Sequence, residues 1–70
     1  MNYSQFNAQI AQKGISKRDI AANLGMSEQA LYNKLNGQTE FKNSEIKKIA
    51  ELLNLSMEAV NIIFFDGSVN

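Results

Sequence analysis

The chain has 70 residues, with seven basic and seven acidic side chains and therefore a formal net charge of zero. That length suits one small domain, and a hydrophobic content of 44% is typical of a folded globule. Cysteine and histidine do not occur, which excludes disulfides and thiolate metal sites and removes the commonest general base. We therefore expect one domain over residues 1–70 that is not an enzyme and holds no metal and no cofactor.

Helix start and stop signals divide the chain into five segments. Each of the four glycines follows an apolar pattern with helical spacing, and glycine is the usual residue just past a helix C-terminus. Ser16, Ser27 and Ser56 stand where the N-caps of the second, third and fifth segments are expected. We therefore predict a compact all-α domain of five helices and no sheet. The predicted helices run from Asn2 or Ser4 to Lys13, from Ser16 to Leu24, from Ser27 to about Asn36, from Asn43 or Ser44 to Asn54, and from Ser56 through Phe64 to a stop at Gly67.

The apolar positions of these segments predict a single core. Phe41 lies in a predicted loop over residues 38–42, and we expect its ring to fold inward as a plug. Glu45, with the neighbouring lysines of the fourth helix, fits a solvated helix face with pairs at i, i+4 spacing. The other predicted core residues are Tyr3, Phe6, Ile10, Ile20, Ala21, Leu24, Leu31, Leu35, Ile46, Ile49, Ala50, Leu53, Leu55, Val60, Ile63 and Phe64.

Residues 16–37 hold two short helical patterns joined through Gly25. Asp19 completes a capping box with the serine that begins this stretch. Ala21 is small enough to let the two helices approach closely, and Leu31 closes the core between them. This is the layout of a helix-turn-helix, whose second helix lies in the major groove of DNA.

The third predicted helix has two different sides. At about 100° per residue, Leu31 and Leu35 fall on one side and polar side chains on the other. Amide side chains can form paired hydrogen bonds with adenine, and a glutamate can accept one from cytosine. An ordinary hydrated surface is the alternative, but the preceding helix and the tight turn favour base reading. The polar side consists of Glu28, Gln29, Tyr32, Asn33 and Asn36.

Residues 14–27, 31–37, 40–41 and 44–50 resemble the lambda-repressor and Cro-like (XRE-type) helix-turn-helix family. The chain is most similar to small Cro-like regulators of temperate phages and prophages of Gram-positive bacteria, and the apolar run at 62–65 is typical of them. The resemblance implies a lambda-repressor-like fold in a cytoplasmic protein of a bacterial host. It also implies binding to double-stranded operator DNA and repression of a phage or prophage genetic switch by operator occlusion.

The candidate site comes from positions that match the DNA-contacting residues of that family. Lys17 replaces a glutamine that clamps a phosphate and can act by charge, whereas Glu28 either reads a cytosine or weakens binding. Lys34 falls on the packing side, and its stem can extend along the core to a phosphate. The resemblance implies base contacts by Glu28, Gln29, Tyr32 and Asn33, and contacts to the DNA backbone by Lys17, Arg18, Ser27, Lys34, Asn36, Gln38 and Lys42.

The charge distribution and the apolar run at 62–65 do not decide whether the chain binds DNA, a second copy of itself or another protein. Residues 1–42 carry five basic and three acidic side chains, a net +2, whereas residues 43–70 carry two and four, a net −2. The apolar run at 62–65 cannot face inward completely, so we expect a two-fold homodimer on DNA, with the state in solution open. The alternative is an anti-repressor or co-regulator that acts through a partner repressor, or an antitoxin-type regulator. No apolar run approaches the roughly 18 residues of a membrane span.

Overall fold

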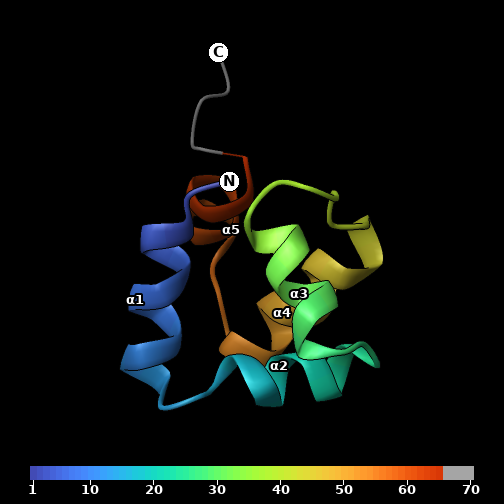
Figure 1. Cartoon of the computed structure of the whole chain (residues 1–70). Coiled ribbons are helices and arrows are strands. Elements are labelled where there is room, and N and C mark those ends of the chain that lie inside the picture. Colours follow the sequence, from blue (N-terminus) through green and yellow to red (C-terminus); the bar gives the residue numbers. More distant parts are fainter. Residues whose placement is uncertain (66–70) are drawn as a thin grey trace.

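Five helices follow one another in the computed structural model, which describes residues 1–65 (Figure 1). No strand occurs among the described residues, so the predicted all-α class with five helices is confirmed. α1 to α4 begin and end at or next to a predicted residue, and α5 begins next to the predicted Ser56 and ends at Phe64, whereas its predicted stop at Gly67 lies outside the described residues. The helices are α1 (Tyr3–Lys13), α2 (Lys17–Leu24), α3 (Glu28–Leu35), α4 (Asn43–Leu53) and α5 (Met57–Phe64).

Side-chain caps explain where α2, α3 and α5 begin. The Ser16 hydroxyl accepts the Asp19 N–H at 3.1 Å, and the Asp19 carboxylate accepts the Ser16 N–H at 3.4 Å. These two bonds are the predicted capping box. The hydroxyls of Ser27 and Ser56 cap α3 and α5 through N–H groups at 3.0 and 3.1 Å. All three predicted serine caps are therefore confirmed.

One core fills the space between the helices. α1 packs against α5 and α4, and α2 packs against α3 and α4 (Figure 1). Every helix contributes to the buried cluster, and all of its members belong to the predicted core. The cluster consists of Phe6, Ile10, Ile20, Ala21, Leu31, Leu35, Ile49, Leu53, Val60, Ile63 and Phe64. The remaining predicted residues are partly buried against it, namely Tyr3, Leu24, Phe41, Ile46, Ala50 and Leu55.

The loop between α3 and α4 folds inward at Phe41, as predicted. The ring of Phe41 meets that of Phe64 edge to face, with centroids 5.4 Å apart, which is a favourable arrangement for two aromatic rings. Because Phe64 belongs to α5, this contact packs the loop against the last helix. The loop is thus held by the core rather than by its own backbone alone.

Both ends of α1 are tied to later parts of the chain. The N–H of Asn2 donates to the carbonyl of Ile63 in α5 at 2.7 Å. At the other end, the Lys13 ammonium donates to the carbonyl of Leu53, which places a cation where the dipole of α4 favours one. No helix among the described residues has the length and apolar content to cross a bilayer.

Candidate functional site

α2 and α3 meet through a turn of three residues. Gly25, with a φ of 71°, directs the chain out of α2, and the N–H of Met26 donates to the carbonyl of Ala21 at 3.0 Å. Ala21 is 2% exposed and belongs with Leu31 to the buried cluster, and α2 and α3 are in close contact. In Figure 1, α3 lies in front of α4. Residues 16–37 therefore form two helices joined by a tight turn, as predicted, and α2 supports α3 from one side.

The outer face of α3, defined here as Glu28, Gln29, Tyr32, Asn33 and Asn36, carries hydrogen-bonding side chains. Asn33 is half-buried and the other four are exposed. Gln29 Nε2 donates to Asn33 Oδ1 at 3.0 Å, one helical turn further along. This bond leaves Gln29 Oε1 and the amide hydrogens of Asn33 for other partners. The polar residues predicted for this helix thus share one surface.

Lys17, at the first position of α2, lies between two tyrosine rings. Its Nζ is 5.2 Å from the centroid of the Tyr3 ring and 5.9 Å from that of the Tyr32 ring, within the range of cation–π attraction. Within residues 1–65, no hydrogen bond or ion pair engages the Lys17 side chain. Lys17 and Tyr32 also line a shallow pocket with Glu28 and Gln29. The ammonium group therefore lies at the edge of the outer face of α3.

Lys34 points away from the outer face and joins α3 to the following loop and to α4. Its Nζ is 3.3 Å from Glu45 Oε1 and donates to the Glu40 carbonyl at 3.1 Å, while the Phe41 ring centroid is 6.0 Å away. The side chains of Lys34 and Glu45 are only 14% and 16% exposed. Among the predicted backbone-contacting residues, Lys34 is thus one whose cation is already paired within the protein. We call Lys34, Glu40, Phe41, Lys42 and Glu45 the Lys34 junction.

Glu45 also begins α4. Its Oε1 accepts the backbone N–H of Lys42 at 2.9 Å, a contact that caps the first turn. Burial would raise the pKa of Glu45, but the hydrogen bonds from Lys42 and Lys34 and the charges of both lysines hold that pKa below its ordinary value of 4.5. The prediction that Glu45 belongs to a solvated face of α4 is wrong, because Lys34 reaches it from another helix. No helical spacing links these two residues, so the sequence contains no signal for their contact.

Apart from Asn36, which belongs to the outer face of α3, the remaining predicted contacts to the DNA backbone lie at the starts of α2 and α3 and in the loop after α3. Arg18 and Ser27 are exposed at the N-terminal ends of α2 and α3, where backbone N–H groups and the helix dipole favour anions. Asn36, Gln38 and Lys42 are exposed at the C-terminal end of α3 and in the loop that follows. These backbone contacts are therefore predicted at helix starts and in the loop after α3, whereas the predicted base contacts lie within α3.

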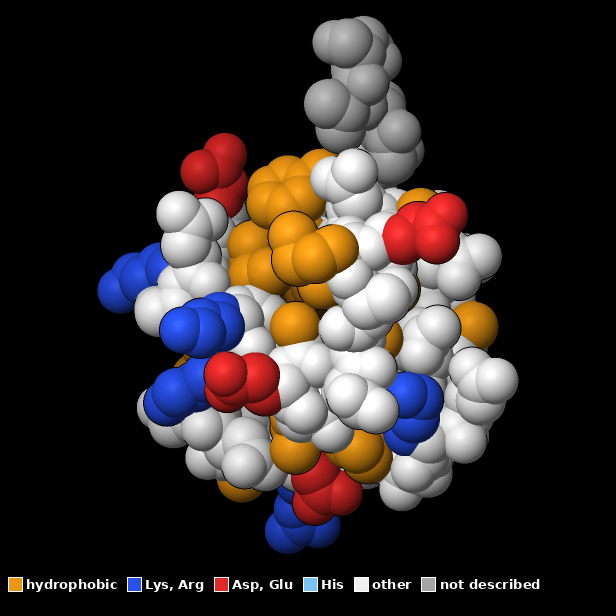
Figure 2. Space-filling model, turned by 180° about the vertical axis from the view of Figure 1, so that it is seen from behind, with side chains coloured by type: hydrophobic (Ala, Val, Ile, Leu, Met, Phe, Trp, Pro, Cys, Tyr) orange, Lys and Arg blue, Asp and Glu red, His pale blue; other side chains and the backbone are white. Residues whose placement is uncertain are grey.

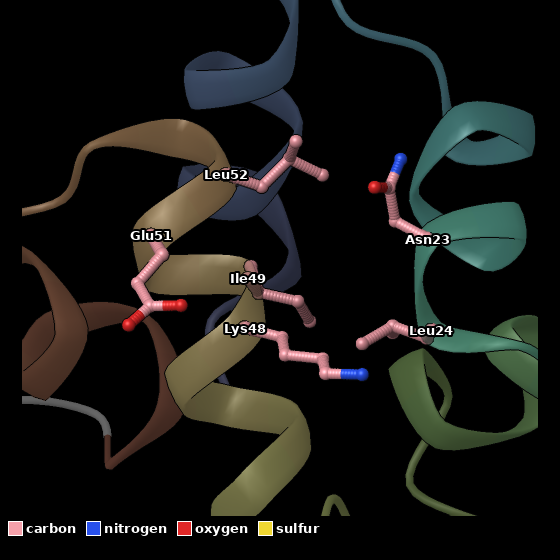
Figure 3. Close-up of a pocket in the computed structure, with 6 residues that line it drawn as sticks. All are labelled: Asn23, Leu24, Lys48, Ile49, Glu51 and Leu52. Atoms are coloured by element: carbon pink, nitrogen blue, oxygen red, sulfur yellow. The ribbon is translucent and has the colours of Figure 1, made fainter.

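A second hollow lies between α2 and α4 (Figure 3). It contains none of the predicted site residues, and in the close-up Glu51 points away from it. Within the described part of the chain there is also no group of three or more acidic, cysteine or histidine side chains that could hold a metal ion. The lining residues are Asn23, Leu24, Lys48, Ile49, Glu51 and Leu52.

α5 leaves apolar side chains at the surface. Met57, Ile62 and Phe65 are 81%, 38% and 50% exposed, whereas Ile63 and Phe64 are buried. Figure 2 shows hydrophobic side chains gathered toward the end of the molecule where α5 lies, with charges of both signs spread over the rest of that face. The apolar run at the end of α5 is thus divided between core and surface, as helical spacing requires.

A family model described as "Protein of unknown function (DUF739)" matches residues 1–67. No curated protein and no solved structure matches the chain.

Proposed function

The chain belongs to the DUF739 family, and we propose that it is a sequence-specific regulator that binds double-stranded DNA through the outer face of α3. The main support for this proposal is the set of side chains on that face. Side chains that suit base edges stand on one side of a helix of eight residues, while Leu31 and Leu35 anchor its other side in the core. A preceding helix and a tight turn are the support that such a helix has in proteins that read the major groove.

Gln29 is the strongest candidate for direct base reading. Its Oε1 and its remaining Nε2 hydrogen suit the N6 and N7 groups of adenine, and its bond to Asn33 limits the rotation of the amide. Glu28 suits the N4 group of cytosine, and Tyr32 suits a thymine methyl or a phosphate. A good bidentate contact discriminates against the wrong base by about 1–3 kcal/mol. Sequence preference would therefore arise from few residues.

Affinity would come from phosphate contacts on the two flanks of that face. Lys17 and Arg18 add positive charge to the N-terminal end of α2, and Lys42 adds charge beyond the other end of α3. Residues 1–42 carry five basic and three acidic side chains, a net +2, which supports this assignment. Lys34 would act indirectly, because its pairing with Glu45 holds the loop in place.

The resemblance to Cro-like regulators supports a finer proposal, namely repression of a phage or prophage switch by occupation of an operator. A two-fold dimer would place two copies of α3 about 34 Å apart on one side of the duplex. The exposed Met57 and Ile62 of α5, with Phe65 just after it, offer apolar surface for contact between the copies.

A DNA titration tests the main proposal. Labelled DNA from the region upstream of the gene is compared with a scrambled duplex of the same composition, at a low and a high salt concentration. We expect binding to the upstream DNA to be at least about a thousandfold tighter, and binding to both duplexes to weaken as salt rises. Weak binding that is equal for the two duplexes would contradict sequence-specific recognition.

A protein-binding regulator is the second candidate, either an anti-repressor or co-regulator of a partner repressor or an antitoxin-type protein. The exposed apolar side chains of α5 and the net charge of zero favour it. It predicts weak, non-specific binding to DNA and a stable complex with the partner protein in size-exclusion chromatography. Replacing Met57 by serine should weaken that complex, whereas Gln29→Ala should leave it intact.

A further inference from the structure

Tyr3 brings α1 to the edge of the outer face of α3. One part of its half-buried ring meets Phe6 edge to face, with centroids 6.5 Å apart, so the fully buried Phe6 supports the ring. The Lys17 ammonium lies 5.2 Å from the Tyr3 ring centroid and 5.9 Å from that of Tyr32. We call Tyr3, Lys17 and Tyr32 the tyrosine clamp. It joins α1, α2 and α3 at one point.

Lys17 occupies a position that is electrostatically unfavourable for a cation. It is the first residue of α2, where the helix dipole is positive, and Arg18 follows it directly. Asp19, the acidic residue of that turn, is bonded to the N–H of Ser16 instead. The two ring faces oppose this cost, because the face of an aromatic ring is negative. Ring faces do not use up the hydrogens of an ammonium group, so these stay available to an acceptor.

We propose that Tyr3 is a positioning residue of the DNA interface, which together with Tyr32 holds the Lys17 ammonium where a phosphate at the start of α2 accepts its hydrogens. The inference rests on the proposed function and adds a residue from α1 to it. A lysine that is already ordered in the free protein loses less side-chain entropy when it binds. Because Tyr32 belongs to α3, the same clamp couples this phosphate contact to the helix that reads bases.

The clamp can be measured without DNA by nuclear magnetic resonance. Ring currents from two tyrosines should move the ε-methylene protons of Lys17 upfield of those of Lys47, an exposed lysine that serves as the internal control. Tyr3→Leu should reduce this upfield shift, and Tyr3→Phe, which keeps an aromatic ring, should retain it. Equal shifts for Lys17 and Lys47 in the wild-type protein would overturn the proposal.

The chain has two tyrosines and no tryptophan, and both tyrosines belong to the clamp. Intrinsic fluorescence therefore reports on the clamp when a duplex is added. A change in tyrosine emission that saturates with duplex is expected for the wild-type protein. The change should be smaller for Lys17→Ala, which removes the cation between the rings. An emission that does not respond to bound duplex would overturn the proposal.

Binding to a random-sequence duplex of about 20 base pairs, two turns of DNA, tests the positioning role. Tyr3→Leu should weaken binding about two- to fivefold, the factor that corresponds to one exposed cation–π contact, and Tyr3→Phe should bind like the wild type. In a Lys17→Ala background, Tyr3→Leu should have no further effect. Losses that add in the double variant would overturn the proposal, since Tyr3 would then act through something other than Lys17.

One result contradicts the proposed function and this inference together, and another contradicts this inference alone. A wild-type protein that binds no duplex contradicts both, even if the Lys17 protons are shifted upfield. Binding that Lys17→Ala weakens and Tyr3→Leu leaves unchanged contradicts the positioning role alone. Thermal denaturation of each variant, followed by circular dichroism, ensures that only folded proteins are compared.

Discussion

Lys34, from which the Lys34 junction is built, belongs to the same short helix as the outer face of α3, yet the polar groups of the two regions are used in opposite ways. In the junction, the Lys34 ammonium pairs with the Glu45 carboxylate and donates to the Glu40 carbonyl, and the same carboxylate accepts the backbone N–H of Lys42. On the outer face, within residues 1–65, Gln29 bonds Asn33, and Glu28 has no hydrogen-bond or ion-pair partner. Polar groups satisfied inside a fold stabilise it, whereas those left to solvent can serve a ligand. Position on one helix therefore does not decide the role of a residue.

The largest effect on stability should come from a substitution in the core that anchors α3, because both regions depend on this helix. Leu31 of α3 is 1% exposed and belongs to the buried core. Leu31→Ala should therefore lower the free energy of unfolding by about 2–5 kcal/mol. A loss of this size is a large fraction of the stability of a small domain. Urea denaturation measures it, with Met57→Ala as the exposed control. Equal losses for the two variants would show that α3 is not anchored through Leu31.

Gln29→Ala should separate the two regions most clearly. Discrimination at one base pair should fall by about 1–3 kcal/mol, because a bidentate contact is lost. The free energy of unfolding should change by less than about 0.5 kcal/mol, because Gln29 is exposed. Competition binding with duplexes that differ at single positions measures the first quantity. Unchanged preferences at every position would remove Gln29 from the proposed base contacts.

Lys34→Met should have the opposite effect to Gln29→Ala, with a loss of stability and little change in DNA binding. The substitution keeps an unbranched stem but removes the ion pair and the bond to the Glu40 carbonyl, so stability should fall by about 1 kcal/mol. Lys47→Met, at an exposed lysine of α4, is the matched control and should have little effect. We expect the salt dependence of DNA binding to stay as in the wild type. A slope reduced by about one unit would show instead that Lys34 reaches a phosphate.

The smallest effect concerns pH. The pKa of Glu45 is lowered in the folded protein, so its ionised form stabilises the fold above the ordinary pKa of 4.5. This contribution is lost as pH falls through the lowered pKa. Glu45→Gln should therefore be less stable than the wild type by up to about 1 kcal/mol near neutral pH, and the two should converge in acid. Denaturation across that pH range tests this, and a difference that does not shrink in acid would contradict it.

Local patterns were enough to predict much of this protein. The serine caps, the glycine stops and the apolar spacing each act within one helix or its first turn, so their geometry follows from the order of residues alone. Phe41 could also be predicted to fold inward, because an isolated aromatic ring in a polar loop favours burial. The outer face of α3 followed from the same helical spacing.

By itself, then, the sequence determined the five helices, the core and the set of side chains that α3 turns outward, since all of these depend on spacing along the chain. The tertiary structure alone decided that Glu45 pairs with Lys34 and that Tyr3 and Tyr32 enclose Lys17. Those contacts join different helices, whose relative placement depends on the packing of the whole core. Spacing along the chain carries no record of that placement.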